Sequence, residues 1–304
     1  MNLPRNLIAY RLTQAVDFSG LGIALQAKPW REPATQELAA AGFIPPLATS
    51  NHMAHYSNAG AKAHLIAFKK TERILPGAVL KEAVAKKVAE IEAQQLRKVY
   101  KKEKEQIKDE VVQALLPRAF LRHRITYAYL LDGMVLVDAS SAKVAEDLMS
   151  TLRDAIGSLP VRPLGVKQAP MATFTDWVSA GDAPRGLYLL DECELRDAGE
   201  DGGVVRAKGQ DLTSEEIQNH LGAGKLVTKL ALAYEDKLSF TLDNKLTIKR
   251  LKFEDLLVDQ AEQDGGDDAH GQSIASLIIV ADTLTGFYAD LISALGGEEL
   301  PEGL

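Results

Sequence analysis

The chain has few of the residues that support disulfides, export or membrane insertion. Its 304 residues include one cysteine, Cys193, which excludes an internal disulfide and fits a reducing compartment. A lone Cys in the segment LLDECEL is more typical of a buried structural residue than of a catalytic thiol. The start, MNLPRNLIAYRLTQ, lacks a basic segment followed by a long apolar core. The longest apolar run near the C-terminus, IASLIIVA, is far shorter than the roughly 20 residues of a membrane span. We therefore expect a cytoplasmic protein with no signal peptide and no membrane partner.

Motifs for catalysis and cofactor binding are lacking as well. In NHLGAGKL, Asn219 stands where a phosphate-binding loop has its first glycine, and Leu226 stands where it has Ser or Thr. His52 and His55 have no further ligands at metal-binding spacing, and the acidic residues 259–268 lack the spacing of a calcium loop. The chain contains no G-x-S-x-G motif. We expect no catalytic residue, no metal and no cofactor.

Positive charge is scarce overall but concentrated in one segment. The chain has a formal net charge of -7, with 35 Lys and Arg against 42 Asp and Glu. Residues 69–124 hold 15 of these basic residues and 8 of the acidic ones, so this segment has a net charge of +7 and the remainder -14. Such asymmetry indicates a polyanionic partner for the basic segment, and the acidic remainder would repel that partner elsewhere.

The local patterns predict an α+β protein with mixed or antiparallel sheets, because strands and helices mix without strict βαβ alternation. Expected strands cover 6–13, 63–75, a hairpin turning at Asp132–Gly133, 159–164, 185–195, 202–208, 225–234, 237–242, 245–253 and 274–280. Expected helices cover 20–28, 76 to about 113, 141–156, a segment from a Thr213–Glu216 capping box to Gly222, and 283–295. Loops are expected around Pro29 to Pro46 and in the acidic segment 259–273.

The segment after Pro76 is predicted to form one long helix. It contains no other proline before Pro117 and only Gly77 near its start. At about 100° per residue, five basic side chains fall within a stripe of about 60°. They are Lys86, Arg97, Lys101, Lys104 and Lys108. Apolar residues, Val84, Val88 and Ile91 among them, fall roughly opposite.

Two interpretations of this basic stripe remain open. It is either a solvated face held by ion pairs, since Glu90 and the Lys101/Glu105 spacing allow them, or a binding face for a polyanion. From Arg97 to Lys108 the stripe would span about 16 Å at about 1.5 Å per residue. Duplex DNA carries about one charge per 1.7 Å, so several phosphate contacts fit this length.

Three further arginines, Arg118, Arg122 and Arg124, surround Phe120 in LLPRAFLRHR. An exposed Phe120 would wedge at a base step or fill a pocket on a partner subunit. A buried core Phe is the third reading, and the sequence leaves the three open.

Long segments distributed over the chain match one protein family in the same order. They are KDEVVQALLPRAF, GGVVRAKGQDLTSEEIQNH, GKLVTKLAL and IKRLKF, with NLIAYRL, GSLPVRPL and the late LGGE. Together they cover essentially the whole chain, which resembles the RdgC family of recombination-associated proteins of proteobacteria. The resemblance implies a cytoplasmic, nucleoid-associated homodimer that closes into a ring around double-stranded DNA. Such proteins bind DNA without sequence preference, restrain RecA-promoted recombination, are not enzymes and need no cofactor; binding of single strands is left open.

The same resemblance implies functional residues. The DNA-binding residues would be Lys86, Arg97, Lys98, Lys101, Lys104, Lys108, Arg118, Arg122 and Lys208. Phe120, in a projecting tip, and Gln210, near a ring-closing contact, would lie in the dimer interface. Gly209 stands where the family has Lys, so Lys208 is the remaining cation of that loop.

The expected organisation has three parts. Residues 1–75 with 125–170 form one α+β domain, residues 76–124 form the long basic helix and projecting tip, and residues 171–304 form a second α+β domain.

Two functions of other classes compete with DNA encirclement. One is a scaffold whose basic helix binds an acidic protein partner, which plain duplex DNA would not displace. The other is a nuclease or phosphoesterase that uses Asp or Glu and a divalent ion, for which the sequence offers no clustered carboxylate motif.

Overall fold

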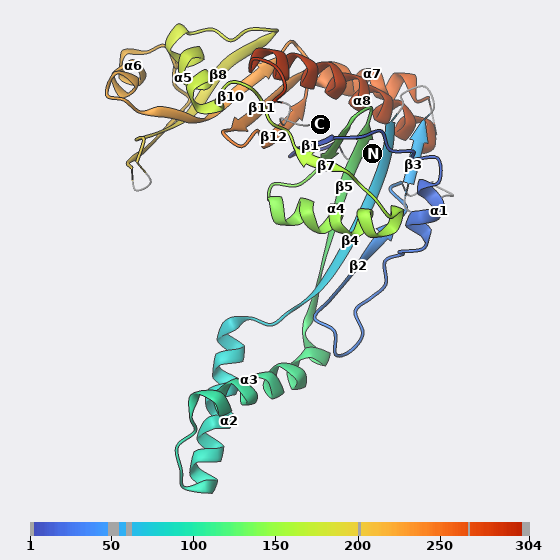
Figure 1. Cartoon of the computed structure of the whole chain (residues 1–304), viewed down its shortest axis with the longest axis vertical. Coiled ribbons are helices and arrows are strands. Elements are labelled where there is room, and N and C mark those ends of the chain that lie inside the picture. The colour runs from blue at the N-terminus through green and yellow to red at the C-terminus, as the bar shows by residue number, and fades with distance from the viewer. Residues whose placement is uncertain (1–2, 48–54, 59–62, 200–201, 267, 300–304) are drawn as a thin grey trace. The chain divides into compact units, whose positions relative to one another are not determined.

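A computed structural model of the chain describes residues 3–47, 55–58, 63–199, 202–266 and 268–299 (Figure 1). The chain divides into two compact units. Unit 1 comprises residues 1–27, 45–67 and 126–304, and unit 2 comprises residues 28–44 and 68–125. The described residues form eight α-helices and two sheets in which the registered strand pairs are antiparallel, which confirms the α+β class. The three-part domain division stays a prediction.

The larger sheet has seven strands in the order β2-β4-β5-β6-β1-β7, with β3 also paired to β4. Its strands are β1 (Ile8–Leu12), β2 (Ala39–Ile44), β3 (His55–Asn58), β4 (Ala63–Ile74), β5 (Phe120–Leu131), β6 (Met134–Val137) and β7 (Val161–Pro163). The smaller sheet has the order β12-β11-β10-β8-β9. Its strands are β8 (Leu187–Arg196), β9 (Val204–Lys208), β10 (Leu226–Tyr234), β11 (Leu238–Asp243) and β12 (Ile248–Phe253).

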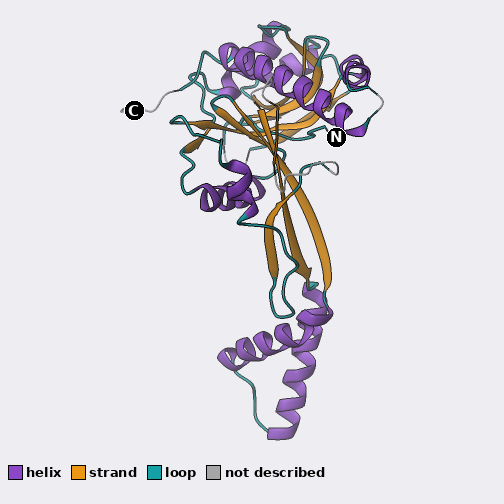
Figure 2. Ribbon diagram, turned by 90° about the vertical axis from the view of Figure 1, so that its right-hand side faces the viewer, coloured by secondary structure: helices purple, strands orange, loops and turns teal. Residues whose placement is uncertain are grey.

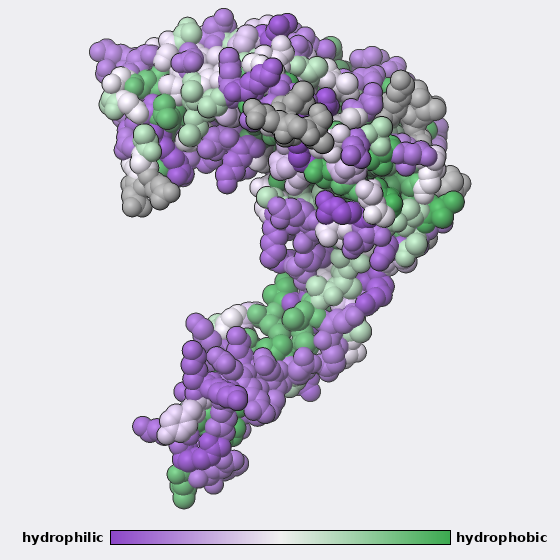
Figure 3. Space-filling model, viewed as in Figure 1, coloured by the Kyte–Doolittle hydropathy of each residue, from purple (hydrophilic) through white to green (hydrophobic). Residues whose placement is uncertain are grey.

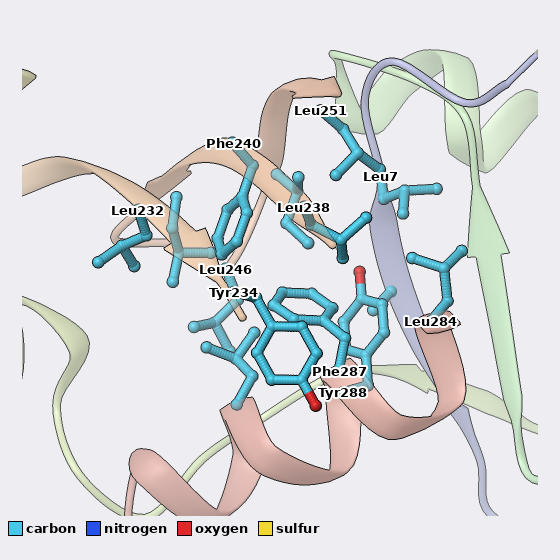
Figure 4. Packing of buried hydrophobic residues seen from close by; sticks show 14 of the residues in the cluster. Leu7, Leu232, Tyr234, Leu238, Phe240, Leu246, Leu251, Leu284, Phe287 and Tyr288 are labelled. Atoms are coloured by element: carbon cyan, nitrogen blue, oxygen red, sulfur yellow. The ribbon is translucent and has the colours of Figure 1, made fainter. Parts of the chain in front are cut away.

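The core of unit 1 follows from strand alternation in the smaller sheet. Apolar residues at alternate positions are buried at the end of β10 (Leu230, Leu232 and Tyr234) and in β11 (Leu238, Phe240 and Leu242). Helix α8 (Ala269–Ala294) covers this face, and its Phe287 ring lies 4.9 Å from Phe240 and 5.2 Å from Tyr234 (Figure 4). Burying each such ring contributes about 1.5–3 kcal/mol, so the three rings together contribute several kcal/mol to the stability of the unit.

Helix α8 corrects the expected loop over 259–273 and strand over 274–280. The chain instead forms α7 (Asp255–Asp264) and then one helix of 26 residues. The Asp268 side chain accepts hydrogen bonds from the N–H groups of His270 and Gly271 and starts α8 inside the acidic segment. A short apolar run such as IASLIIVA does not distinguish a strand from a buried helix.

The same helix is long and apolar enough to cross a membrane, with a mean hydropathy of 1.5. Its apolarity has a simpler cause, because Leu277, Leu284 and Leu291 are buried in the core of unit 1. A core helix of a globular protein passes the same test of length and composition.

The N-terminal segment joins the two sheets within unit 1. Leu7 exchanges two backbone hydrogen bonds of 2.9 Å with Ile248 of β12, and both side chains are fully buried. The cores on the two sheets therefore merge into one cluster.

Most other local predictions are confirmed. The turn at Asp132–Gly133 joins β5 and β6 with Leu131 opposite Met134. Helix α4 (Ala142–Ile156) ends at Gly157, whose φ of 82° favours glycine. The short helix α1 (Leu21–Gln26) also forms where expected.

Three further elements were missed, among them strand β3 (His55–Asn58), which pairs with β4. Strand β2 has the sequence AAAGFI, which has little β-propensity and depends on pairing with β4. Helix α5 (Pro170–Ala180) starts at a proline in its first turn and packs on β10 through apolar side chains including Phe174 and Val178.

The predicted capping box is wrong. Helix α6 (Glu215–Gly222) has Ser214 at its N-cap. The Thr213 hydroxyl instead donates to Asp211 at 2.7 Å, and the Glu216 carboxylate accepts from Gln210 at 2.7 Å.

In unit 2 the predicted single helix is also wrong. The chain forms α2 (Gly77–Gln95) and α3 (Lys101–Leu115), two separate helices joined by a short segment (Figure 2). We call α2 and α3 the helix pair. The break occurs at Leu96, which has φ 50° and ψ 36° and is 91% exposed.

Burial of apolar surface explains the break. Val99 is buried against Ile107 and Val111 of α3, with half-buried Val84 and Val88 of α2 packed on them. The Val99 N–H also donates to the Glu92 carboxylate at 2.9 Å. A single straight helix would have exposed this whole apolar stripe to water, so packing outweighs the cost of placing Leu96 in the left-handed region.

The helix pair ends close to Pro117, as predicted from the sequence. Helix α3 ends at Leu115, and Pro117 lies in a 3-10 turn, η1 (Leu116–Arg118), before β5 begins.

Replacing Leu96 tests the break directly. We expect Leu96→Gly to raise the free energy of unfolding of unit 2 by about 1 kcal/mol, because glycine adopts positive φ without steric cost. Within a continuous helix the same change would lower stability by about 1 kcal/mol. Hydrogen exchange of the α2 and α3 amides gives the sign, and Leu96→Ala, which keeps a Cβ, should not stabilise.

Candidate nucleic-acid interface

The two units differ strongly in charge. Residues 28–44 and 68–125 of unit 2 contain 17 Lys and Arg and 10 Asp and Glu, a net charge of +7. The remaining residues, which make up unit 1, contain 18 basic and 32 acidic residues, a net charge of -14. The basic segment noted in the sequence therefore coincides with a structural unit.

The break at Leu96 corrects the single basic stripe derived from a continuous helix. Lys86 lies on α2 and Arg97 lies in the connecting segment. Lys101, Lys104 and Lys108 remain on α3 at spacings of three and four residues, which places them on one helical face. Three of the five cations thus share a face, and the other two are positioned by the packing of the helix pair.

Some of the predicted cations are occupied by carboxylates. The Arg97 guanidinium forms two hydrogen bonds with the Glu103 carboxylate, at 2.7 and 2.6 Å, and lowers the pKa of that carboxyl group. Arg122 pairs with Glu72 at 2.8 Å. A phosphate would have to compete with these carboxylates, so we expect Arg97 and Arg122 to contribute less than an unpaired cation.

A larger group of cations has no such partner. In the described part of the chain, six of the predicted DNA-binding residues of unit 2 are exposed and form no ion pair. They are Lys86, Lys98, Lys101, Lys104, Lys108 and Arg118. The surface of the helix pair is accordingly mostly hydrophilic (Figure 3).

A groove of about 700 Å³ runs along the helix pair. Its lining combines apolar residues of α2, including Leu80, Val84 and Val88, with Lys104 and Lys108 of α3. The Lys87–Glu110 ion pair, at 2.5 Å, links the two helices. Lys81 and Glu92 also line the groove, which therefore offers an apolar floor beside three lysines and one carboxylate.

Phe120 is 84% exposed at the start of β5, so the reading of it as a core residue is wrong. Leu121 and Ile125 of the same strand are also exposed, at 36% and 45%. By strand alternation Phe120 points to one side of β5 and Leu121 and Ile125 to the other, and Arg118 and Arg124 are their neighbours in sequence. The structure leaves both surface readings of Phe120, the wedge and the subunit contact, as proposals.

Lys208 and Gln210 lie in unit 1, at the end of β9. Lys208 is exposed and lies opposite Glu192 of β8. The Gln210 N–H donates to the Asp191 carbonyl at 3.2 Å. Between them Gly209 has φ 63°, which explains a glycine here, since a lysine would be strained at this position.

The described residues offer few side-chain arrangements that could support catalysis. Among the described residues, no group of three or more His, Cys, Asp or Glu side chains is placed to hold a metal ion. His52 lies outside the described residues. Burial raises the pKa of the Cys193 thiol to about 11, so it stays protonated and is a poor nucleophile at neutral pH.

Comparison with known proteins agrees with the sequence segments noted above. The family model described as "Putative exonuclease, RdgC" matches residues 3–298. A recombination-associated protein RdgC of Pseudomonas aeruginosa (strain LESB58) is 58% identical over 306 residues, covering 99% of each chain. Those of Pseudomonas syringae pv. syringae (strain B728a) and Pseudomonas putida are each 56% identical, again over 99% of both chains. This chain therefore belongs to the RdgC family of recombination-associated proteins.

Proposed function

We propose that this protein binds double-stranded DNA without sequence preference, as a homodimeric ring in the nucleoid, and restrains RecA-promoted recombination without being an enzyme. The observation that carries the proposal is the set of six exposed cations of unit 2 that have no carboxylate partner. Unpaired cations gain most from phosphate contacts, because no ion pair has to be broken first. Phosphate contacts carry no sequence information, which accounts for nonspecific binding.

The homodimer is supported by the exposed apolar residues of β5. Phe120, Leu121 and Ile125 present apolar surface that a second copy would remove from water. In the ring we propose, Phe120 lies at one subunit contact and Gln210 lies near the other, with the cations lining the enclosed channel. Lys208 adds a cation near the second contact.

The protein would restrain recombination by occupying the duplex. A duplex covered by closed rings is less available to a recombinase filament, so no direct contact with RecA is required. Binding of this kind consumes no cofactor and breaks no bond.

The groove of the helix pair favours a second candidate function. An amphipathic acidic helix would place its apolar face on Leu80, Val84 and Val88 and its carboxylates near Lys104 and Lys108. In that case the protein is a scaffold for an acidic partner, and plain duplex DNA would not compete for the groove.

Charge removal on α3 tests the DNA proposal. We expect Lys101→Gln/Lys104→Gln/Lys108→Gln to flatten the slope of log K against log salt for duplex DNA by about 2.7 per chain, at about 0.9 per contact. The matched control is Lys143→Gln/Arg153→Gln/Lys237→Gln, which removes three charges from unit 1 and should leave the slope unchanged. A slope that is unchanged in a folded α3 variant would contradict the proposal.

Strand-exchange assays test the mode of restraint. We expect the wild-type protein to inhibit RecA-promoted exchange in proportion to the duplex it covers, and added competitor duplex to relieve the inhibition. The α3 variant should inhibit less. Inhibition that is independent of DNA concentration would point to direct contact with RecA, and DNA cleavage that EDTA abolishes would establish a nuclease.

Substitution at the exposed apolar surface tests the dimer. We expect Phe120→Asp to lower the molecular mass in solution toward that of a single chain, because a carboxylate would be desolvated in the contact. Tyr100→Asp is the matched control, since Tyr100 is also an exposed aromatic residue of unit 2, at 75%. Equal loss of mass in both variants, or in neither, would contradict the role of Phe120.

A further inference from the structure

A cleft of about 880 Å³ opens beside the point where the two sheets of unit 1 meet. The sheets are joined there by the backbone bridge between Leu7 and Ile248. The chain neighbours of the bridged residues, Ile8, Thr247 and Lys249, line the cleft, so the bridge holds its two walls together. Small-molecule sites in proteins have volumes of about 300–1,000 Å³, and this cleft falls within that range.

Each sheet supplies one wall of the cleft. The first wall includes Tyr10 of β1 and Glu146 of α4, and the second includes Lys245 in the turn between β11 and β12. Apolar side chains complete the lining, namely Ile8, Pro163, Met171 and Leu226. The cleft therefore combines charged groups on both walls with apolar surface.

The charged side chains of the cleft are balanced in number. Four carboxylates and four cations line it: Glu146, Glu194, Asp197, Asp243, Arg196, Lys229, Lys245 and Lys249. A polyanion would be repelled by the carboxylates as strongly as it is attracted by the cations, so it does not fit this lining.

Six of these eight charges are already held in ion pairs. Glu194 pairs with Lys229 at 2.8 Å and with Arg196 at 3.1 Å. Asp243 pairs with Lys249 at 3.1 Å. Asp197 pairs with a lysine outside the cleft lining, Lys225. These pairs neutralise one another and leave little attraction for a ligand.

The two remaining charges have opposite signs and lie on opposite walls. Glu146 and Lys245 are both exposed, and neither forms an ion pair within the part of the chain that the structure describes. A ligand that completes the pairing must therefore carry one positive group and one negative group.

A buried hydroxyl group gives independent evidence for a ligand. Tyr10 lines the cleft and is only 8% exposed, yet no described residue forms a hydrogen bond with its hydroxyl group. Buried polar side-chain atoms in native proteins nearly all have a hydrogen-bond partner. Burial, together with the Glu146 carboxylate, raises the pKa of the Tyr10 phenol, so the hydroxyl keeps its proton and can donate it.

We propose that this cleft binds a small zwitterion, an amino acid or a short peptide, with its ammonium group at Glu146 and its carboxylate at Lys245. The Tyr10 hydroxyl donates to a carbonyl or carboxylate oxygen of the ligand, and the apolar lining receives the ligand's side chains. The site goes beyond the proposed function, because it uses none of the six unpaired cations of unit 2 and takes no nucleic acid.

Peptides with blocked ends test the two charges separately. The probes are the tetrapeptide Ala-Leu-Leu-Ala with free ends, its N-acetylated, C-amidated and doubly blocked forms, and free leucine. Saturation-transfer difference NMR on the whole chain gives the dissociation constants. We expect each block to weaken binding by about two- to fivefold, the effect of one exposed ion pair. Leucine that binds as tightly as the free peptide identifies an amino-acid site, and weaker binding of leucine identifies a peptide site.

Single substitutions assign each end of the ligand. In Glu146→Gln, acetylation should no longer weaken binding while amidation still does, and in Lys245→Gln the pattern should be reversed. Tyr10→Phe, which keeps the ring, should weaken all four peptides by about fivefold, because one hydrogen bond is lost. The matched controls are Glu215→Gln and Arg153→Gln, which remove the same charges from exposed positions of unit 1 outside the cleft and should change no affinity.

Three results would overturn the site. One is that no probe binds to the wild-type protein. Another is that acetylation and amidation have the same effect in Glu146→Gln and Lys245→Gln as in the wild type. The third is that the control variants alter the affinities as much as the cleft variants, since only net charge would then matter. The salt dependence of duplex binding is a separate measurement, so each of these failures leaves the proposed function standing.

Discussion

The packing of α8 on one face of the smaller sheet is the contact on which the rest of unit 1 depends. It commits alternate apolar residues at the end of β10 and in β11 to the core, with Phe287 in contact with Tyr234 and Phe240. Strand alternation then assigns the intervening residues to the opposite face. That face can carry charge at little cost to the fold, because its side chains remain in contact with water or with each other.

Apolar burial has a comparable consequence in unit 2. The small core around Val99, Ile107 and Val111 folds the chain back after α2, and the face of the helix pair seen in Figure 3 is mostly hydrophilic. Five basic residues that would lie on one straight helix are thereby distributed over two helices and their connection. Both units use one apolar contact to hold a set of cations in place, although their net charges have opposite signs.

Much of the fold could be predicted from local patterns. The turn at Asp132–Gly133, the end of α4 at Gly157 and the antiparallel strands β10 to β12 all depend on signals within a few residues. The wrong predictions concern elements whose secondary structure depends on contacts with residues far away in the sequence. Strand β2 needs its partner β4, α8 needs the sheet that it covers, and the break at Leu96 needs the apolar surface of α3.

The sequence by itself determined the α+β class, the family and the concentration of positive charge in residues 69–124. Only the tertiary structure decided which cations are held by carboxylates, as Arg97 is by Glu103, and which remain unpaired, as Lys104 does among the described residues. It also decided that Glu194 and Arg206 share one face of a sheet. The physical reason is that charge composition is a local property, whereas the pairing of charges depends on distances between side chains that are far apart in the chain.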